Sequence, residues 1–194
     1  MSLRALSALA ALSGLGTSPF EPAGLRGLAL WLAADGPIYQ DAAMTNPATA
    51  DGHIVRGWAD QSGDGNHVTS PMGYVTLKLN VLNGKPVLRG AGEYFYLGTG
   101  LGHSISPQAP VTVFAVARTN SPASGRRRIC SFQTGNNVGW GFGQQLDYAE
   151  YLLTTYGVRS YVAETPSWGA TQWGIHVARF DTSFNVQFWT NGGD

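Results

Sequence analysis

The residues of this chain whose types and spacing best suit chemistry lie in Asp60-Gln-Ser-Gly-Asp-Gly-Asn66. Asp60, Ser62 and Asp64 place side-chain oxygens at positions 1, 3 and 5, as in the first half of an EF-hand calcium loop. Pro71 stands at position 12, where that loop needs a bidentate glutamate. The same residues also suit a hairpin turn in which Asp60 and Ser62 cap backbone amides. The segment predicts either a calcium site at Asp60, Ser62 and Asp64 or, as the favoured interpretation, a structural turn.

Carbohydrate binding is the second chemistry that the residue types suggest, because sugars pack on aromatic faces beside neutral amides and hydroxyls. Strand alternation in residues 184–190 directs Asn185, Gln187 and Trp189 to one face. Residues 148–168 add further aromatics. The candidate ligand-binding residues are Trp189, Asn185, Gln187, Tyr161 and Trp168. The competing interpretation is that many of these aromatics cover a second sheet or an interface.

Catalytic patterns are absent from the sequence. A retaining glycosidase needs two carboxylates about 5 Å apart. The nearest pair, Asp147 and Glu150, has a spacing of three that puts the two on opposite faces of a strand. No Gly-x-Ser-x-Gly elbow, His-Glu-x-x-His motif or P-loop occurs, and His176 is expected to be a core or sheet residue. The sequence therefore predicts a protein that is not an enzyme.

The elements that must position these residues are strands, as the composition indicates. Charged residues make up only 12% of the 194 residues and hydrophobic residues 43%, and there are 26 glycines. Low charge with many glycines for turns is typical of a sandwich or barrel. The 12 basic and 12 acidic residues give zero net charge, which argues against nucleic-acid binding. No run approaches the roughly 20 apolar residues that span a bilayer.

Short runs at regular spacing predict the individual strands. Gly27–Ala33 is apolar throughout, Val75–Val81 alternates apolar and polar residues, and Asn83-Gly84 predicts a turn with positive φ angles. Val111–Ala117 is apolar on both faces, which predicts a central strand. Further strands are expected at 127–134, 138–143, 157–163, 173–180 and 184–190. The predicted fold class is all-β, without convincing amphipathic helices after residue 24.

Residues 1–24 form an N-terminal arm and linker by composition. The Ala/Leu-rich start repeats leucine at helical spacing, and 17–24 contains two prolines and a glycine. Ser7 and Ser13 dilute the apolar stretch, and no clean cleavage site follows it. The favoured interpretation is a retained arm that docks on a partner protein. The alternatives are a signal peptide and a leader that packs on its own domain.

Five segments resemble, in the same order, motifs of concanavalin A-like (LamG-like) domains of bacterial surface proteins and phage virion proteins. GLALWLAAD at 27–35 is similar to the family's first strand, and VRGWADQSGDGN at 55–66 to its next segment. LNGKPVLR at 82–89 also matches, although Gly90 follows where the family has phenylalanine. VTVFAVAR at 111–118 and VQFWTNG at 186–192 complete the series.

The resemblance implies a two-sheet antiparallel jelly-roll sandwich over residues 25–194, preceded by the 1–24 arm. Domains of this type usually continue with further strands after the Asn-Gly turn. We therefore expect either that the native chain continues past Asp194 or that a partner chain completes the sheet, since an open edge promotes association.

The function expected on these grounds is a non-enzymatic structural or adhesion module of a phage virion, in a fibre, spike or decoration protein. It would present a glycan-binding jelly-roll to the host surface, contact other virion proteins through 1–24 and form a homo-oligomer. A purely architectural virion role is one alternative. Another is a secreted or cell-surface bacterial carbohydrate-binding adhesion module. Calcium is the one candidate cofactor, and no nucleic-acid partner or membrane span is expected.

Overall fold

The computed structural model describes residues 21–70, 75–90, 96–97, 110–118, 126–133, 139–145, 148–155, 158–163, 173–180 and 186–190. The chain divides into two compact units. We call Pro19–Ile105 the N-terminal unit and Ser106–Asp194 the C-terminal unit.

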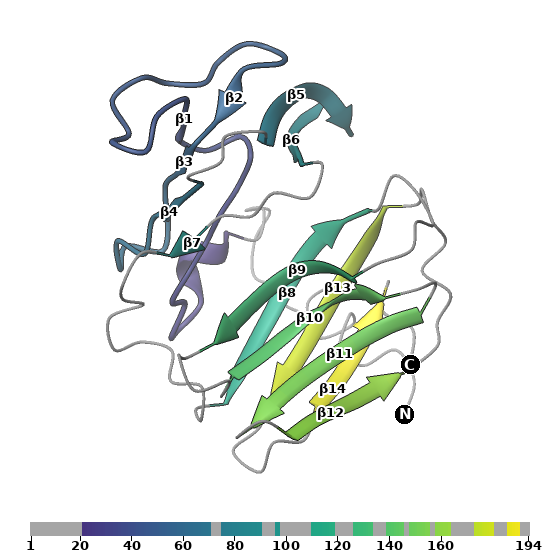
Figure 1. The fold of residues 1–194 in the computed structure, drawn as a ribbon. Helices are drawn as coiled ribbons and strands as arrows, with labels where there is room; N and C mark the ends of the chain where they lie inside the picture. The colour runs from purple at the N-terminus through teal and green to yellow at the C-terminus, as the bar shows by residue number, and fades with distance from the viewer. Residues whose placement is uncertain are drawn as a thin grey trace, which may run out of the picture. The chain divides into compact units, whose positions relative to one another are not determined.

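Antiparallel strands build both units, and the helix η2 (Pro22–Gly24) is a short 3-10 turn (Figure 1). The N-terminal unit holds sheets of order β1-β3-β4-β7 and β2-β5-β6, and the C-terminal unit holds sheets of order β12-β11-β10-β9 and β14-β13-β8. The strands are β1 (Ile38–Tyr39), β2 (Ile54–Val55), β3 (Gly57–Trp58), β4 (Val68–Thr69), β5 (Val75–Leu82), β6 (Lys85–Arg89), β7 (Tyr96–Leu97), β8 (Val111–Ala117), β9 (Arg126–Gln133), β10 (Gly139–Gln145), β11 (Tyr148–Thr155), β12 (Val158–Ala163), β13 (Gly174–Phe180) and β14 (Val186–Thr190).

This architecture confirms the prediction of an all-β protein. The strand β8 has the bounds predicted from its apolar run, and β9, β10, β12, β13 and β14 begin and end at most two residues from the expected positions. The strand β11, which pairs with both β10 and β12, has no predicted counterpart. Among the described residues no helix is long and apolar enough to cross a membrane.

The β5–β6 hairpin turns at the predicted Asn83-Gly84 pair. Both residues have positive φ angles, 50° and 75°, which is the geometry of a two-residue type I′ turn. The alternation along β5 holds only for its first half, because Val75 and Leu77 are buried whereas Leu79 is 39% exposed. Asn80 explains the change: its φ angle is 55°, and the β5–β6 register shifts between Lys78 and Leu82. Such a bulge rotates the rest of the strand.

The apolar run Gly27–Ala33 does not form the predicted strand, since the structure assigns no ladder to these residues. Side chains and amides from 58–66 bind its backbone instead. The Trp31 carbonyl accepts from the Gln61 N–H at 2.8 Å. The Asn66 amide nitrogen donates to the Ala29 carbonyl at 2.7 Å, and the Trp58 indole N–H to the Ala33 carbonyl at 2.9 Å. These bonds satisfy backbone groups that a neighbouring strand would otherwise pair.

A small apolar core stabilises the N-terminal unit. Ile38, Ala48, Val55 and Leu77 are buried together, with Trp58 and Leu88 packed against them in part. Ile38 and Ala48 belong to the turn-rich stretch 35–53, whose β1 strand pairs with β3. This stretch therefore contributes to the core of the unit.

The three-stranded sheet of the C-terminal unit has two unlike faces. Gly174, His176 and Ala178 of β13 are buried on one face. Their neighbours Ile175 and Arg179 are exposed on the other. Strand alternation separates the two sets, and the face that carries Ile175 and Arg179 is the one described below as a candidate site.

Candidate functional site

Asp60 is the centre of a hydrogen-bonded turn in the N-terminal unit. Its Oδ1 accepts from the backbone N–H groups of Trp31 at 2.8 Å and Ser62 at 2.9 Å. Its Oδ2 accepts from the Ser62 hydroxyl at 2.7 Å and the Asn66 N–H at 2.9 Å. Asp60 is only 8% exposed, and a buried carboxylate is stable only when donors replace its water. Four protein donors meet that requirement here.

The same contacts set the charge state of Asp60. Burial by itself would raise the pKa of this carboxyl. The hydrogen bonds from the Ser62 hydroxyl and from the amides of Trp31, Ser62 and Asn66 together outweigh that effect and hold the pKa below its usual value. Asp60 is therefore a carboxylate at neutral pH, and its negative charge fixes the turn.

The candidate metal residues Asp60, Ser62 and Asp64 are brought together in this turn. The Ser62 hydroxyl donates to Asp60 and accepts from the Asp64 N–H at 3.2 Å, and the Asp60 N–H donates to His67 Nδ1 at 3.0 Å. A calcium ion bound to Asp60 would have to displace some of these donors. Within the described residues no group of three or more His, Cys, Asp or Glu side chains is placed to hold a metal. These contacts support the structural turn, and calcium binding stays a prediction.

One face of the sheet β14-β13-β8 is the second candidate site. The register pairs Phe114 with Val177 and Val116 with Ile175, and it pairs Val177 in turn with Trp189. Residues opposite one another in neighbouring strands share a face. We call this surface the outward face, and its members are Thr112, Phe114, Val116, Arg118, Trp173, Ile175, Val177, Arg179, Gln187 and Trp189.

Large apolar side chains are open to solvent on the outward face. Phe114 is 62% exposed, Val116 58% and Ile175 50%. Val177 and Trp189 are half-buried beside them, and Gln187 is exposed. Contiguous apolar surface of this kind marks a binding site more often than a scattered single residue does.

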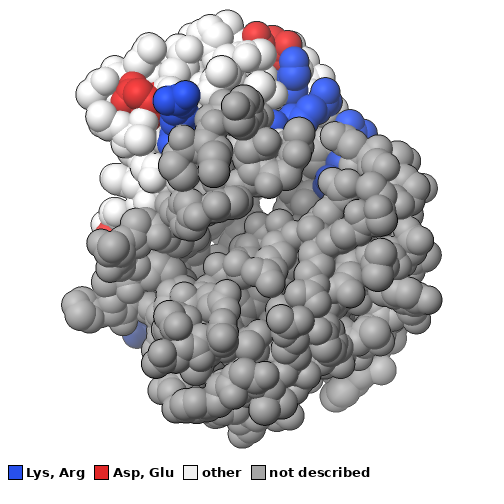
Figure 2. Space-filling view, viewed as in Figure 1, with Lys and Arg blue, Asp and Glu red and all other residues white. Residues whose placement is uncertain are grey.

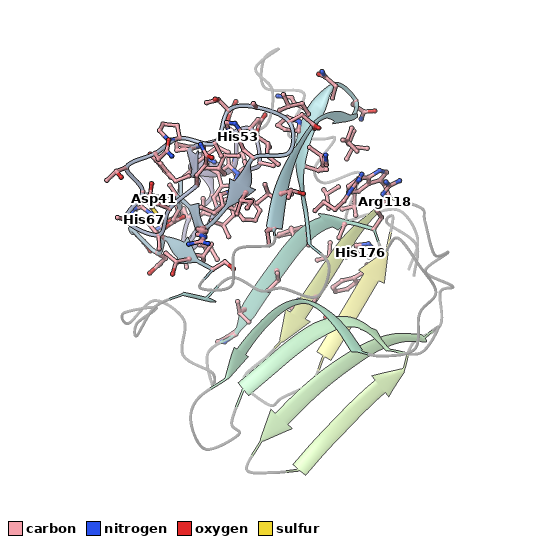
Figure 3. All side chains as sticks on the ribbon, turned by 45° about the horizontal axis from the view of Figure 1, so that its top comes forward. Asp41, His53, His67, Arg118 and His176 are labelled. Carbon is pink, nitrogen blue, oxygen red and sulfur yellow. The ribbon has the colours of Figure 1, made fainter. Side chains whose placement is uncertain are left out.

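A stacked arginine lies at one end of the outward face. The Arg118 guanidinium carbon is 5.0 Å from the centre of the Trp173 ring, which is cation–π geometry. Figure 3 labels Arg118 beside the end of β8, with His176 on the neighbouring strand β13. The stack holds the guanidinium in place and leaves its N–H edge able to donate.

His176 occupies the opposite, buried face of β13, as the sequence indicated. It is fully buried, and its Nε2 lies 3.4 Å from the Ala117 carbonyl. Burial lowers the pKa of His176 to about 4, although the hydrogen bond to Ala117 acts in the other direction. At neutral pH the ring is uncharged and belongs to the packing of the sheet.

The structure brings together two of the five residues predicted to bind ligand. Gln187 and Trp189 lie side by side on the outward face, as strand alternation predicts. Tyr161 belongs to β12, in the other sheet of the C-terminal unit. Asn185 and Trp168 lie outside the described residues.

Sequence reasoning missed the residues of β8 and β13 on this face. The signal was present, because Val111–Ala117 is apolar at every position except Thr112. That pattern indicated a central strand, whereas β8 is the last strand in the order β14-β13-β8 among the residues described. The outward positions Phe114 and Val116 are also exposed, although the apolar pattern predicts that both faces are covered.

The described part of the N-terminal unit carries both acidic and basic side chains. On the face in view, Figure 2 shows acidic side chains next to basic ones there. Lys78 binds Asp51 at 3.0 Å, and Lys85 binds Asp35 at 2.7 Å. These exposed pairs contribute little to stability.

Comparison of the chain with protein-family models, with curated proteins and with solved structures found no match.

Proposed function

We propose that this chain is a non-enzymatic jelly-roll module of a virion structural or adhesion protein, and that its outward face binds glycans. The exposed aromatic and apolar surface formed by Phe114, Ile175 and Trp189 carries this proposal. Sugars present C–H groups to such surfaces and hydroxyls to adjacent polar groups, which Gln187 and Thr112 supply here.

The position of this surface on a sheet supports a binding role. Hydrogen-bonded ladders hold β8, β13 and β14 in register, so the backbone positions that carry these side chains are set before any ligand arrives. Pre-organised sites lose less conformational entropy on binding. Figure 1 shows these three strands as neighbours.

The sandwich arrangement and the virion location belong to the same proposal. They rest on the five motifs between residues 27 and 192 and on a composition low in charge. In a fibre, spike or decoration protein the module would be repeated by symmetry, which raises the avidity of a weak glycan site. A bacterial adhesion module would use the same face, and the mature N-terminus of native material distinguishes the two locations.

A glycan array probed with the full chain tests the binding proposal. We expect selective binding that Trp189→Ala and Phe114→Ser each weaken about tenfold, equivalent to about 1.4 kcal/mol. Ile54→Ala is the matched control, because Ile54 is 43% exposed in the N-terminal unit. A blank array from a folded sample would overturn glycan binding and leave an architectural role.

A further inference from the structure

The ends of the outward face carry positive charge. Arg118 lies at one end, opposite Trp173, and Arg179 lies at the other end, opposite Thr112. The described residues of this face include no aspartate or glutamate. A ligand on this surface therefore meets two cations and no anion among the side chains described.

Two lysines of the N-terminal unit are in a different situation. Lys78 and Lys85 each bind a carboxylate of the same unit. Among the described residues no salt bridge joins Arg118 or Arg179 to an acidic side chain. Arginine is also the side chain whose planar fork matches a carboxylate or sulfate with two parallel hydrogen bonds.

The spacing of the two arginines indicates the shape of the ligand. Six residues of β8 separate position 112 from position 118, which corresponds to about 20 Å at strand rise. The register places Arg179 beside Thr112, so the two arginines are separated by about that length. Phe114, Val116 and Ile175 fill the surface between them. An extended ligand that runs along the strands would contact both charges and the apolar surface.

We infer that the outward face binds an extended anionic polysaccharide, with one acidic group at Arg118 and another at Arg179. The inference rests on the proposed function and names its ligand class. Trp173 holds Arg118 in position, and Trp189 and Phe114 pack against the faces of the sugars between the two charges. Carboxylates and sulfates are equally suited to the arginine fork.

The experiment compares polymers that differ only in charge. De-esterified homogalacturonan is compared with its methyl ester, and dextran sulfate with dextran, as hexamers or longer chains binding to the full protein. We expect one charged polymer to bind at least tenfold more tightly than its neutral counterpart, and salt to weaken only the charged interaction. Binding of de-esterified homogalacturonan would identify the acidic group as a carboxylate, and binding of dextran sulfate would identify it as a sulfate.

Substitutions then assign the binding to the two arginines. Arg118→Gln and Arg179→Gln should each weaken binding of the charged hexamer about tenfold, and the double variant about a hundredfold, because sites this far apart act additively. Arg26→Gln, at an exposed arginine of the N-terminal unit, should leave binding unchanged. A charged dimer is too short to contact both arginines, so the double substitution should weaken its binding far less than the loss of about a hundredfold expected for the hexamer.

The outcomes separate this inference from the proposed function. Equal binding of the charged and neutral polymers, or binding that neither arginine substitution weakens, would overturn the anionic ligand and leave glycan binding intact. If none of the four polymers binds while the array detects a neutral glycan, the anionic ligand is likewise overturned and glycan binding is retained. Failure of the polymers together with a blank array would reject both.

Discussion

The two units of this protein are stabilised by different means. In the N-terminal unit β1, β2, β3, β4 and β7 have two residues each. Side-chain groups bind much of the backbone there. Asp60 accepts from three amides, and the Asp41 carboxylate accepts from the Thr45 and Asn46 amides. In the C-terminal unit strands of five to eight residues pair with one another in long ladders.

This difference indicates which positions of each unit tolerate amino-acid substitutions. A ladder binds backbone groups whatever the side chains are, so the outward face of β8 and β13 is available for exposed aromatic and charged residues. The turns of the N-terminal unit depend on named carboxylates and glycines instead. Single substitutions should therefore be more damaging at the polar turn positions of the N-terminal unit than on the outward face.

The largest effect is expected at Asp60. Asp60→Ala removes the acceptor of four hydrogen bonds and leaves buried donors unpaired, which should lower the free energy of unfolding by about 3 kcal/mol or more. Urea denaturation followed by hydrogen exchange should locate the loss in the N-terminal unit. Asp64→Asn, at an exposed position of the same loop, should cost less than about 1 kcal/mol.

The same pair of variants tests whether the turn binds calcium. If the turn is structural, millimolar calcium should leave the melting temperature of the wild-type protein unchanged, because ligand-linked stabilisation requires binding. A calcium-dependent rise that Asp64→Asn abolishes would show instead that Asp60, Ser62 and Asp64 form a metal site.

Acid should destabilise the C-terminal unit first. His176 has a pKa lowered from 6.5 to about 4, so the unfolded chain takes up a proton between these values and the folded unit does not. Stability is full above pH 6.5 and should fall by about 3 kcal/mol as the pH approaches 4. Asp60, with its lowered pKa, contributes stability above about pH 3.9, the pKa of an unperturbed aspartate, and loses it only as the pH falls further.

Hydrogen exchange at pH 7 and at pH 4.5 measures this difference for each unit. Peptides of β8 and β13 should lose protection at pH 4.5, while those around Asp60 keep it. His176→Gln should abolish the pH dependence in the C-terminal unit. Equal loss of protection in the two units would contradict the assignment of the early acid response to His176.

A smaller effect is expected at the β5–β6 turn. Gly84→Ala introduces a side chain at a φ angle of 75°, which should cost about 1 kcal/mol although nothing lies within 4 Å of the added Cβ. Gly24→Ala is the matched control, because its Cβ is equally unobstructed and no positive φ is required. Thermal unfolding of both variants provides the measurement, and equal stabilities would contradict a turn controlled by backbone conformation.

The smallest effect is expected on the outward face. Phe114→Ser should change the free energy of unfolding by less than about 0.5 kcal/mol, because Phe114 is 62% exposed. Leu77→Ala, at a buried position of the N-terminal unit, should cost about 2–5 kcal/mol. A cost at Phe114 comparable with that at Leu77 would mean that another surface covers this face.

The sequence by itself determined the local features of this protein. Alternation and apolar runs predicted β8 and the neighbouring positions of Gln187 and Trp189, and Asn83-Gly84 predicted the type I′ turn. These features depend on side-chain period and on allowed φ angles, which are properties of a few adjacent residues.

Only the tertiary structure decided how distant segments pair. Gly27–Ala33 has a strand pattern, yet Asn66 and Trp58 bind its backbone where a ladder was expected. Val111–Ala117 is apolar on both faces, yet Phe114 and Val116 are exposed and lie beside Arg118. An apolar composition indicates which residues can be buried. Whether they are buried depends on which other segments cover them, and those segments are distant in the sequence.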